Sequence, residues 1–138
     1  MLVLVDTPVW SLALRRVSSD LNPRELHLTE ALRELIRDGR VQLVGLVRQE
    51  LLSGIRHEAV FRKLRDQLRA FDEPRLEIAD YEEAASINDQ CRSRGIAGSA
   101  VDFLICAVAL RRNWQTFTTD RDFERYAKVA PFSLYTPS

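Results

Sequence analysis

The sequence predicts an α/β fold in which a central parallel sheet of about five short strands is flanked by helices. Two observations carry this prediction: short apolar runs that are typical of buried strands, and longer segments with helical spacing between them. Strands that alternate with helices form parallel sheets covered on both faces. The chain has 138 residues, 46% of them hydrophobic and 29% charged, so we expect a single domain over residues 1–138.

The strand prediction begins with residues 2–5, where the run LVLV is apolar throughout and ends at Asp6. A continuous run of this kind is typical of a strand that is buried on both faces of a parallel sheet. Four later short segments are also assigned to strands. The predicted strands cover residues 2–5, 41–44, 76–78, 115–118 and 132–135.

Helices are predicted where apolar residues recur every three or four positions between capping residues. The clearest one begins at Asn22, because Asn22 is a favourable N-cap, Pro23 suits the first turn and Glu25 completes a capping box. Gly39 is expected to end this helix. The predicted helices cover residues 9–14, 22–39, 46–56, 60–71, 81–91, 99–110 and 120–126.

The composition limits the classes of protein that fit. The net charge is +0, which disfavours a protein that simply coats nucleic acid. No apolar run approaches the roughly 18 residues of a membrane-spanning helix, and the N-terminus lacks the basic segment of a secretory signal. We therefore expect a cytoplasmic protein with no membrane contact. Cys91 and Cys106 lie in apolar helical patterns and are expected to be buried free thiols.

Two aspartates stand directly after predicted strands. Asp6 follows residues 2–5 and Asp120 follows residues 115–118, so both are expected at the carboxyl edge of the sheet, where such folds bind ligands. The alternative interpretation of each is an N-cap of the next helix. Asp122 is a further acid near the same edge.

Two other acids lie beside apolar residues within predicted helices. Glu50 borders the apolar stripe of its helix, and its alternative interpretation is a surface acid paired with Arg48 or Arg56. Asp102 lies inside a strongly apolar helix, where an ionised carboxylate is costly to bury without a partner. Ser99 and Asp102 form a capping-box pattern, which is compatible with a role for Asp102 in holding a cation.

Carboxylates gathered at one edge of a sheet predict a site for a divalent cation. Close carboxylates repel and raise one another's pKa unless a cation neutralises them. Oxygen ligands favour Mg²⁺ or Mn²⁺ over Zn²⁺, and His27 and His57 have no partner at ligand spacing. Such a site suits phosphodiester hydrolysis, because the cation activates water and stabilises charge on phosphate. The hydroxyl groups of Thr118 and Ser99 are candidates to support it.

Four segments of the chain resemble the PIN domain and, within it, the VapC-type toxins of bacterial toxin–antitoxin pairs. The similarity runs from Val3 to about Phe132, which is nearly the whole chain. The segments that carry it are VDTPVW at 5–10, ELLSG at 50–54, SAVDFLICA at 99–107 and TTDRDF at 118–123.

The resemblance implies a Mg²⁺- or Mn²⁺-dependent endoribonuclease that cuts structured RNA of the tRNA or rRNA class. The residues that match the acidic quartet of the family, and that we expect to be catalytic and metal-binding, are Asp6, Glu50, Asp102 and Asp120. The supporting candidates are Asp122, Thr118, Ser99 and Thr7.

The family also implies a homodimer and a small cognate antitoxin whose C-terminal segment wraps the toxin. The helix faces expected to supply the groove lie around Leu51, Leu52, Val60 and Leu64. Arginine dominates the basic residues, with 18 Arg against 2 Lys, and its planar fork suits phosphate oxygens. The arginines expected to grip RNA are Arg15, Arg16, Arg48, Arg92 and Arg121.

Two alternatives remain at this stage. One is a PIN-like module that binds RNA or a protein partner without cutting, in which the acids are helix caps and surface pairs. The other is a metal-dependent phosphatase or DNA nuclease that uses the same carboxylates. Metal-dependent cleavage excludes the first, and substrate preference separates the second from a ribonuclease.

Overall fold

The computed structural model describes all residues from 1 to 138 and has a four-stranded sheet at its centre. The strand order is β2-β1-β3-β4 and every pairing is parallel, as the sequence predicts. Residues Val5 and Phe117 are partners at the ends of the two middle strands. The strands are β1 (Val3–Val5), β2 (Val41–Gln42), β3 (Gln115–Phe117) and β4 (Ser133–Leu134).

One of the five predicted strands, residues 76–78, is absent from the structure, so that prediction is wrong. Leu76 and Glu77 lie in a loop, and Ile78 is the first residue of a helix. The reason is a capping box: the Glu77 N–H donates to Asp80 Oδ2 at 2.7 Å, while the Glu77 side chain accepts from the third residue of the helix. The alternation of Leu76, Glu77 and Ile78 imitates a strand over too few residues to outweigh this cap.

Seven α-helices and one short 3-10 helix surround the sheet. Each predicted helix exists, with ends that differ from the prediction by a few residues. Asn22 and Glu25 form the predicted capping box, and Gly39 follows the helix in a left-handed conformation with φ of +67°. The helices are α1 (Thr7–Leu14), α2 (Pro23–Arg37), α3 (Gly45–Leu52), α4 (Glu58–Leu68), α5 (Ile78–Ser93), α6 (Ala100–Arg112) and α7 (Asp122–Val129), and the 3-10 helix is Ser18–Asp20.

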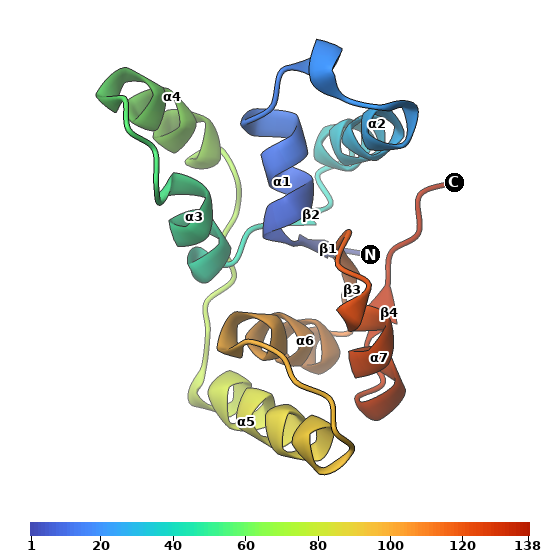
Figure 1. Ribbon diagram of the computed structural model, residues 1–138. Helices are drawn as coiled ribbons and strands as arrows, with labels where there is room; N and C mark the ends of the chain where they lie inside the picture. Colours follow the sequence, from blue (N-terminus) through green and yellow to red (C-terminus); the bar gives the residue numbers. More distant parts are fainter.

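The helices cover both sides of the sheet (Figure 1). Helices α1 and α2 lie on one side, α6 and α7 lie on the other, and α5 packs outside α6. Helix α6 is the most buried, since every residue from 103 to 109 is inaccessible to solvent or nearly so. Cys91 and Cys106 are buried free thiols, as predicted. No helix has both the length and the apolar character needed to cross a lipid bilayer.

The topology positions the carboxyl ends of the two central strands side by side. Asp6 follows β1 and Thr118 follows β3, and these strands are hydrogen-bonded neighbours. Helix α6 leads into β3 through a short turn, so its N-terminus lies toward the same edge of the sheet. Residues that are more than 90 positions apart in the sequence therefore meet at this edge.

Candidate active site at the carboxyl edge of the sheet

Asp6 is the most buried acid of the predicted quartet, with 5% of its surface exposed. Its Oδ1 accepts a hydrogen bond from the Thr7 N–H at 2.8 Å, so Asp6 is the N-cap of α1. Its Oδ2 accepts from the Thr118 hydroxyl, also at 2.8 Å. The capping interpretation and a functional interpretation are thus compatible, because one oxygen serves the helix and the other faces the neighbouring strand end.

Thr118 joins Asp6 to Asp120. The Thr118 hydroxyl donates to Asp6 and accepts from the Asp120 N–H at 3.0 Å. Asp120 in turn accepts from the Asp122 N–H at 2.9 Å, although the N-cap position of α7 is Arg121 and not Asp120. The Asp122 carboxylate is bonded to Arg125 at 2.9 Å on its own helix. The loop after β3 is therefore held against the end of β1 by side chains rather than by strand pairing alone.

Asp102 lies in the first turn of α6 and is partly exposed. Its N–H donates to Ser99 Oγ at 3.1 Å, which confirms Ser99 as the N-cap of this helix. Its Oδ2 accepts from the Tyr126 hydroxyl at 3.2 Å. The carboxylate thus has a fixed direction that comes from a tyrosine on α7.

Glu50 is exposed on α3 and is the least constrained member of the quartet. The alternative interpretation of Glu50 as a surface acid requires an ion pair with Arg48 or Arg56, and neither arginine is paired with it. Arg48 is bonded to Glu73 at 3.0 Å instead, and Arg56 forms no ion pair. The negative charge of Glu50 nevertheless reaches Asp6, where it raises the pKa of the aspartate.

Two acids at the carboxyl edge of the sheet have raised pKa values, as is typical of carboxylates that are buried close to one another. Burial raises the pKa of Asp6 from its ordinary value of 3.8 to about 6, although the hydrogen bonds from Thr118 and Thr7 oppose this change. The charges of Asp102 and Glu50 add to the increase. Burial likewise raises the pKa of Asp102, and Asp120 contributes by repulsion. No lysine or arginine is paired with Asp6 or Asp102, so the charges of these acids are not neutralised within the chain.

The donor set fits a hard divalent cation in its chemistry. The available ligands are carboxylate and hydroxyl oxygens, which Mg²⁺ and Mn²⁺ prefer, and a cation offsets the cost of a buried, repelled carboxylate such as Asp6. As they stand, however, no three side chains of the His, Cys, Asp or Glu type are arranged to hold a metal ion together.

Tyr126 is a site residue that sequence reasoning missed. Its side chain is fully buried, and its hydroxyl lies 3.2 Å from Asp102 Oδ2 and 3.4 Å from the Ala97 carbonyl oxygen. A Cβ atom at Gly98 would lie 2.5 Å from this hydroxyl, so the loop before α6 requires glycine there. No local pattern connects Tyr126 with Asp102, because 24 residues separate them in the chain.

The five arginines proposed from the sequence have different surroundings. Arg48 forms an ion pair with Glu73 at 3.0 Å, whereas Arg16 lies 4.0 Å from Glu25. The arginines that are exposed and form no ion pair are Arg15, Arg92 and Arg121. Arg24, which was not proposed, is also exposed and unpaired.

The fold and the site together define an α/β protein with acidic residues gathered at the carboxyl edge of a parallel sheet. The PIN domain model matches residues 3–129, which is most of the chain. The chain therefore belongs to the PIN domain family, as the resemblance of the four sequence segments implies.

Solved structures with the same fold cover almost the whole chain at low sequence identity. VapBC2 from Rickettsia felis, bound to a DNA fragment from its promoter, is 15% identical, covers 98% of each chain and has a TM-score of 0.77. FitAcB from Neisseria gonorrhoeae is 18% identical over 99% of this chain and 98% of the other, with a TM-score of 0.73. A toxin–antitoxin complex from Klebsiella pneumoniae is 15% identical over 99% and 98%, with a TM-score of 0.71.

Proposed function

We propose that the protein is a Mg²⁺- or Mn²⁺-dependent endoribonuclease that acts as the toxin of a toxin–antitoxin pair. Its substrate is structured RNA of the tRNA or rRNA class, in which it hydrolyses phosphodiester bonds. Membership of the PIN domain family supports the nuclease activity. Similarity to solved toxin–antitoxin complexes supports the role as a toxin.

One observation carries the proposal: Asp6 is buried without a cationic partner and is repelled by two neighbouring carboxylates. A group of this kind destabilises the chain unless a ligand uses it. A divalent cation is the ligand that neutralises several carboxylates at once, and it is also what phosphodiester hydrolysis requires.

The residues proposed to hold the cation are Asp6, Glu50, Asp102 and Asp120. When bound, a divalent cation lowers the pKa of a water molecule and stabilises negative charge on the scissile phosphate. The chain's own contribution is orientation. Thr118 fixes one oxygen of Asp6 and the backbone of Asp120, while Tyr126 fixes one oxygen of Asp102. Ser99 acts through its hydroxyl oxygen, which accepts the Asp102 N–H at the start of α6, and Thr7 acts through its own N–H, which donates to Asp6 at the start of α1.

A cognate antitoxin is part of this proposal. Val60 of the expected groove is 53% exposed and lines a hollow of about 540 Å³ between α1 and α4, together with Leu14 and Ile55. Leu64 also lines this hollow although only 3% of it is exposed, whereas Leu51 belongs to the hydrophobic core and Leu52 is partly buried. We therefore propose that the antitoxin segment occupies the hollow around Val60, with Leu64 as part of its lining.

We also propose a homodimer and a cytoplasmic location. Ile78 and Tyr81 of α5 are 79% and 55% exposed, and Tyr81 borders an apolar hollow of about 390 Å³ lined also by Leu46 and Phe103. Exposed apolar surface of this kind is typical of protein interfaces. A second copy of the chain that packs on α5 buries it.

Cleavage of a structured RNA pool tests the enzymatic proposal. Purified protein is expected to cut RNA with Mg²⁺ or Mn²⁺ and not with a chelator. Asp102→Asn keeps the shape of the side chain and the Ser99 cap, and it is expected to reduce the rate on the order of 100-fold. Asp89→Asn, on an exposed face of α5, is the matched control and is expected to cut normally.

Two results contradict the proposal. If no RNA is cut in either metal by antitoxin-free protein, the chain is a binding module. If single- or double-stranded DNA is cut in preference to RNA, the same carboxylates belong to a DNA nuclease. Circular dichroism of Asp102→Asn, compared with the wild type, shows that a lost activity is not a lost fold.

A further inference from the structure

Two hollows adjoin the acidic edge on the side of the molecule where α2 begins. The first has a volume of about 440 Å³ and lies between α1 and the start of α2. The second, of about 180 Å³, lies between α2, the loop after β3 and the C-terminal residues. Arg24, Leu28 and Thr119 line both hollows, so the two form one groove with Arg24 at the junction.

The groove is continuous with the candidate active site. Its second part is lined by Thr118 and Asp120, which belong to the acidic edge. Its first part leads away from that edge past Pro8 to Arg16. A polymer with one phosphate at the carboxylates therefore has a path along the surface in this direction.

The positive charge in the groove is free to bind an anion. Arg24 is exposed and forms no ion pair, and Arg121 on the rim of the second hollow has none either. Arg16 is 4.0 Å from Glu25, whose carboxylate already accepts the Asn22 N–H at 3.0 Å in the capping box of α2. Unpaired arginines beside a phosphodiester-cleaving site suit the phosphates of the same strand.

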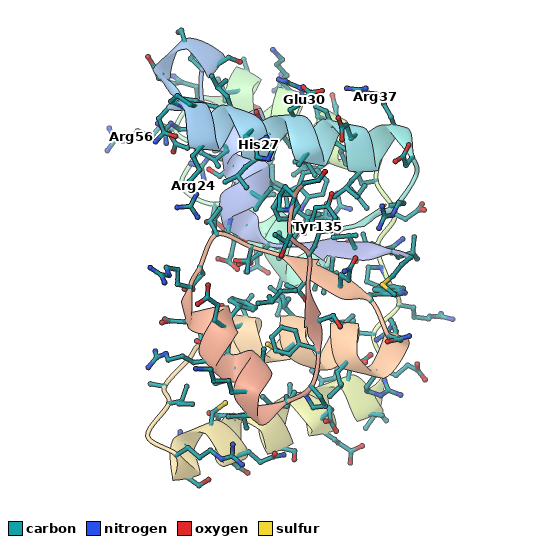
Figure 2. All side chains as sticks on the ribbon, turned by 90° about the vertical axis from the view of Figure 1, so that its right-hand side faces the viewer. Arg24, His27, Glu30, Arg37, Arg56 and Tyr135 are labelled. Atoms are coloured by element: carbon teal, nitrogen blue, oxygen red, sulfur yellow. The ribbon has the colours of Figure 1, made fainter.

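An aromatic side chain completes the second hollow. Tyr135 is partly exposed, and its ring packs against Phe117 with 5.0 Å between the ring centroids. Its N–H donates to the Thr116 carbonyl at 2.8 Å, so the sheet fixes its backbone. In Figure 2, Tyr135 lies below α2 on the same side as Arg24. Aromatic rings beside arginines are the surfaces on which proteins stack unpaired bases.

The geometry points to this groove as the subsite that binds single-stranded RNA beside the cleaved bond, with Arg24 on a phosphate and Tyr135 stacked on a base. This inference rests on the proposed ribonuclease function, because it uses the acidic edge as the place of cleavage. The inference identifies the part of the protein surface that binds the RNA strand next to the cleaved bond. It also shows how a chain of zero net charge can bind RNA, since Arg24 and Arg121 line the groove without an ion pair to a carboxylate of the chain.

Binding of a fluorescent, unstructured RNA oligonucleotide in chelator tests the groove without cleavage. Arg24→Ala is expected to weaken binding about ten-fold and to reduce the slope of log K against log salt by about 0.7, the value for one phosphate contact on a single strand. Tyr135→Leu, which keeps apolar contact with Phe117, is expected to weaken binding at least five-fold. The matched controls are Arg33→Ala on the exposed side of α2 and Trp114→Leu, whose ring is partly exposed beside Arg112 and lines neither hollow, and both are expected to bind as the wild type does.

The outcomes for the groove and for the proposed function are separable. If Arg24→Ala and Tyr135→Leu bind RNA as their controls do while the wild type still cuts RNA, the assignment of the groove is wrong and the proposed ribonuclease function is supported. If they lose binding but the wild type cuts no RNA in either metal, the groove binds RNA but is not a subsite beside a cleaved bond, and the proposed function fails. Equal binding of a DNA oligonucleotide of the same sequence overturns the assignment to RNA, and the thermal midpoint of each variant shows whether it is folded.

Discussion

Asp6 and Asp80 are both buried aspartates, yet their surroundings are opposite. Asp80 has no exposed surface and accepts hydrogen bonds from Arg111 at 2.6 Å and from Arg112 at 2.7 and 3.0 Å. The hydrogen bonds from Arg112 are the largest cause that lowers its pKa far below the ordinary range, against the effect of burial. Asp6 is also buried, but no cation of the chain is bonded to it, and burial raises its pKa to about 6.

The difference separates a structural carboxylate from a functional one. Asp80 ties the start of α5 to the end of α6, and its charge is neutralised within the chain. Asp6 has hydrogen-bond donors but no opposite charge, so its ionised carboxylate carries a cost in the folded chain that a proton or an external cation removes. An internally neutralised acid therefore stabilises the fold, whereas an acid without a counter-charge indicates a binding site.

Among the substitutions that test this difference between the two aspartates, the one at Asp6 is expected to have the largest effect, which is on RNA cleavage. We expect Asp6→Asn to reduce metal-dependent RNA cleavage roughly 1,000-fold, because it removes a negative ligand from the acidic edge. The asparagine still caps α1, so the metal-free variant is expected to be at least as stable as the wild type at neutral pH. RNA cleavage rates and thermal midpoints in chelator measure the two effects. A variant that cuts within ten-fold of the wild type means that Asp6 is only a helix cap.

The opposite pattern is expected at Asp80. Asp80→Asn leaves the two arginines without their buried partner, and we expect the free energy of unfolding to decrease by about 3 kcal/mol. Urea denaturation measures this loss, and cleavage per folded molecule is expected to be unchanged. Glu82→Gln, on the exposed side of the same helix, is the control and is expected to stay within about 0.5 kcal/mol of the wild type. If Asp80→Asn costs no more than this control, the contrast between the two aspartates is wrong.

Tyr126 gives a further test of the difference between the two aspartates, because its hydroxyl orients the Asp102 carboxylate without neutralising its charge. Tyr126→Phe keeps the ring, which packs 5.1 Å from Phe103, and removes only the hydroxyl that is bonded to Asp102. We expect the affinity for Mn²⁺ to decrease ten- to 100-fold, as for other residues that orient metal ligands. The electron paramagnetic resonance signal of free Mn²⁺ measures the affinity in the folded protein. Unchanged Mn²⁺ affinity with reduced stability in chelator assigns the hydroxyl a structural role only, and Tyr81→Phe is the exposed control.

The sequence predicts the arrangement of the acidic edge because that arrangement follows from local rules. Short apolar runs alternating with helices require parallel strands, and parallel strands put Asp6 and the loop of Asp120 at one edge. The cap at Asn22 and the stop at Gly39 depend on single residues and were also predictable. Residues 76–78 were misassigned because three residues carry too little periodicity to distinguish a strand from a loop that leads into a helix.

The sequence does not indicate which side chains that lie far apart in the chain contact one another. Asp80 resembles any acid on the polar side of a helix, and its burial follows from arginines 31 and 32 positions later. The bond between Tyr126 and Asp102 spans 24 positions and depends on a glycine at position 98. Each depends on how two helices pack, which a local pattern does not specify.

The smallest expected effect is a difference in the pH dependence of stability between the two aspartates. Between about pH 4 and pH 6, the folded chain still holds a proton on Asp6 that the unfolded chain has lost, because its pKa is raised from 3.8 to about 6. The free energy of unfolding in chelator therefore falls as pH rises through this window, by at most about 3 kcal/mol for a shift of this size. The contribution of Asp80 has the opposite sign, since its lowered pKa gives stability that is present above about pH 3.8 and lost below it.

Urea denaturation of the wild type and Asp6→Asn at a series of pH values isolates the effect of Asp6. The wild type is expected to lose stability relative to the variant as pH rises from 4 to 6, and the difference is expected to be constant above that range. Saturating Mn²⁺ is expected to reverse the trend, because a cation binds the ionised carboxylate and stabilises the folded state as its concentration exceeds the dissociation constant. A relative stability that does not change with pH in chelator means that water or a nearby cation already solvates Asp6, and the cost that distinguishes it from Asp80 is then absent.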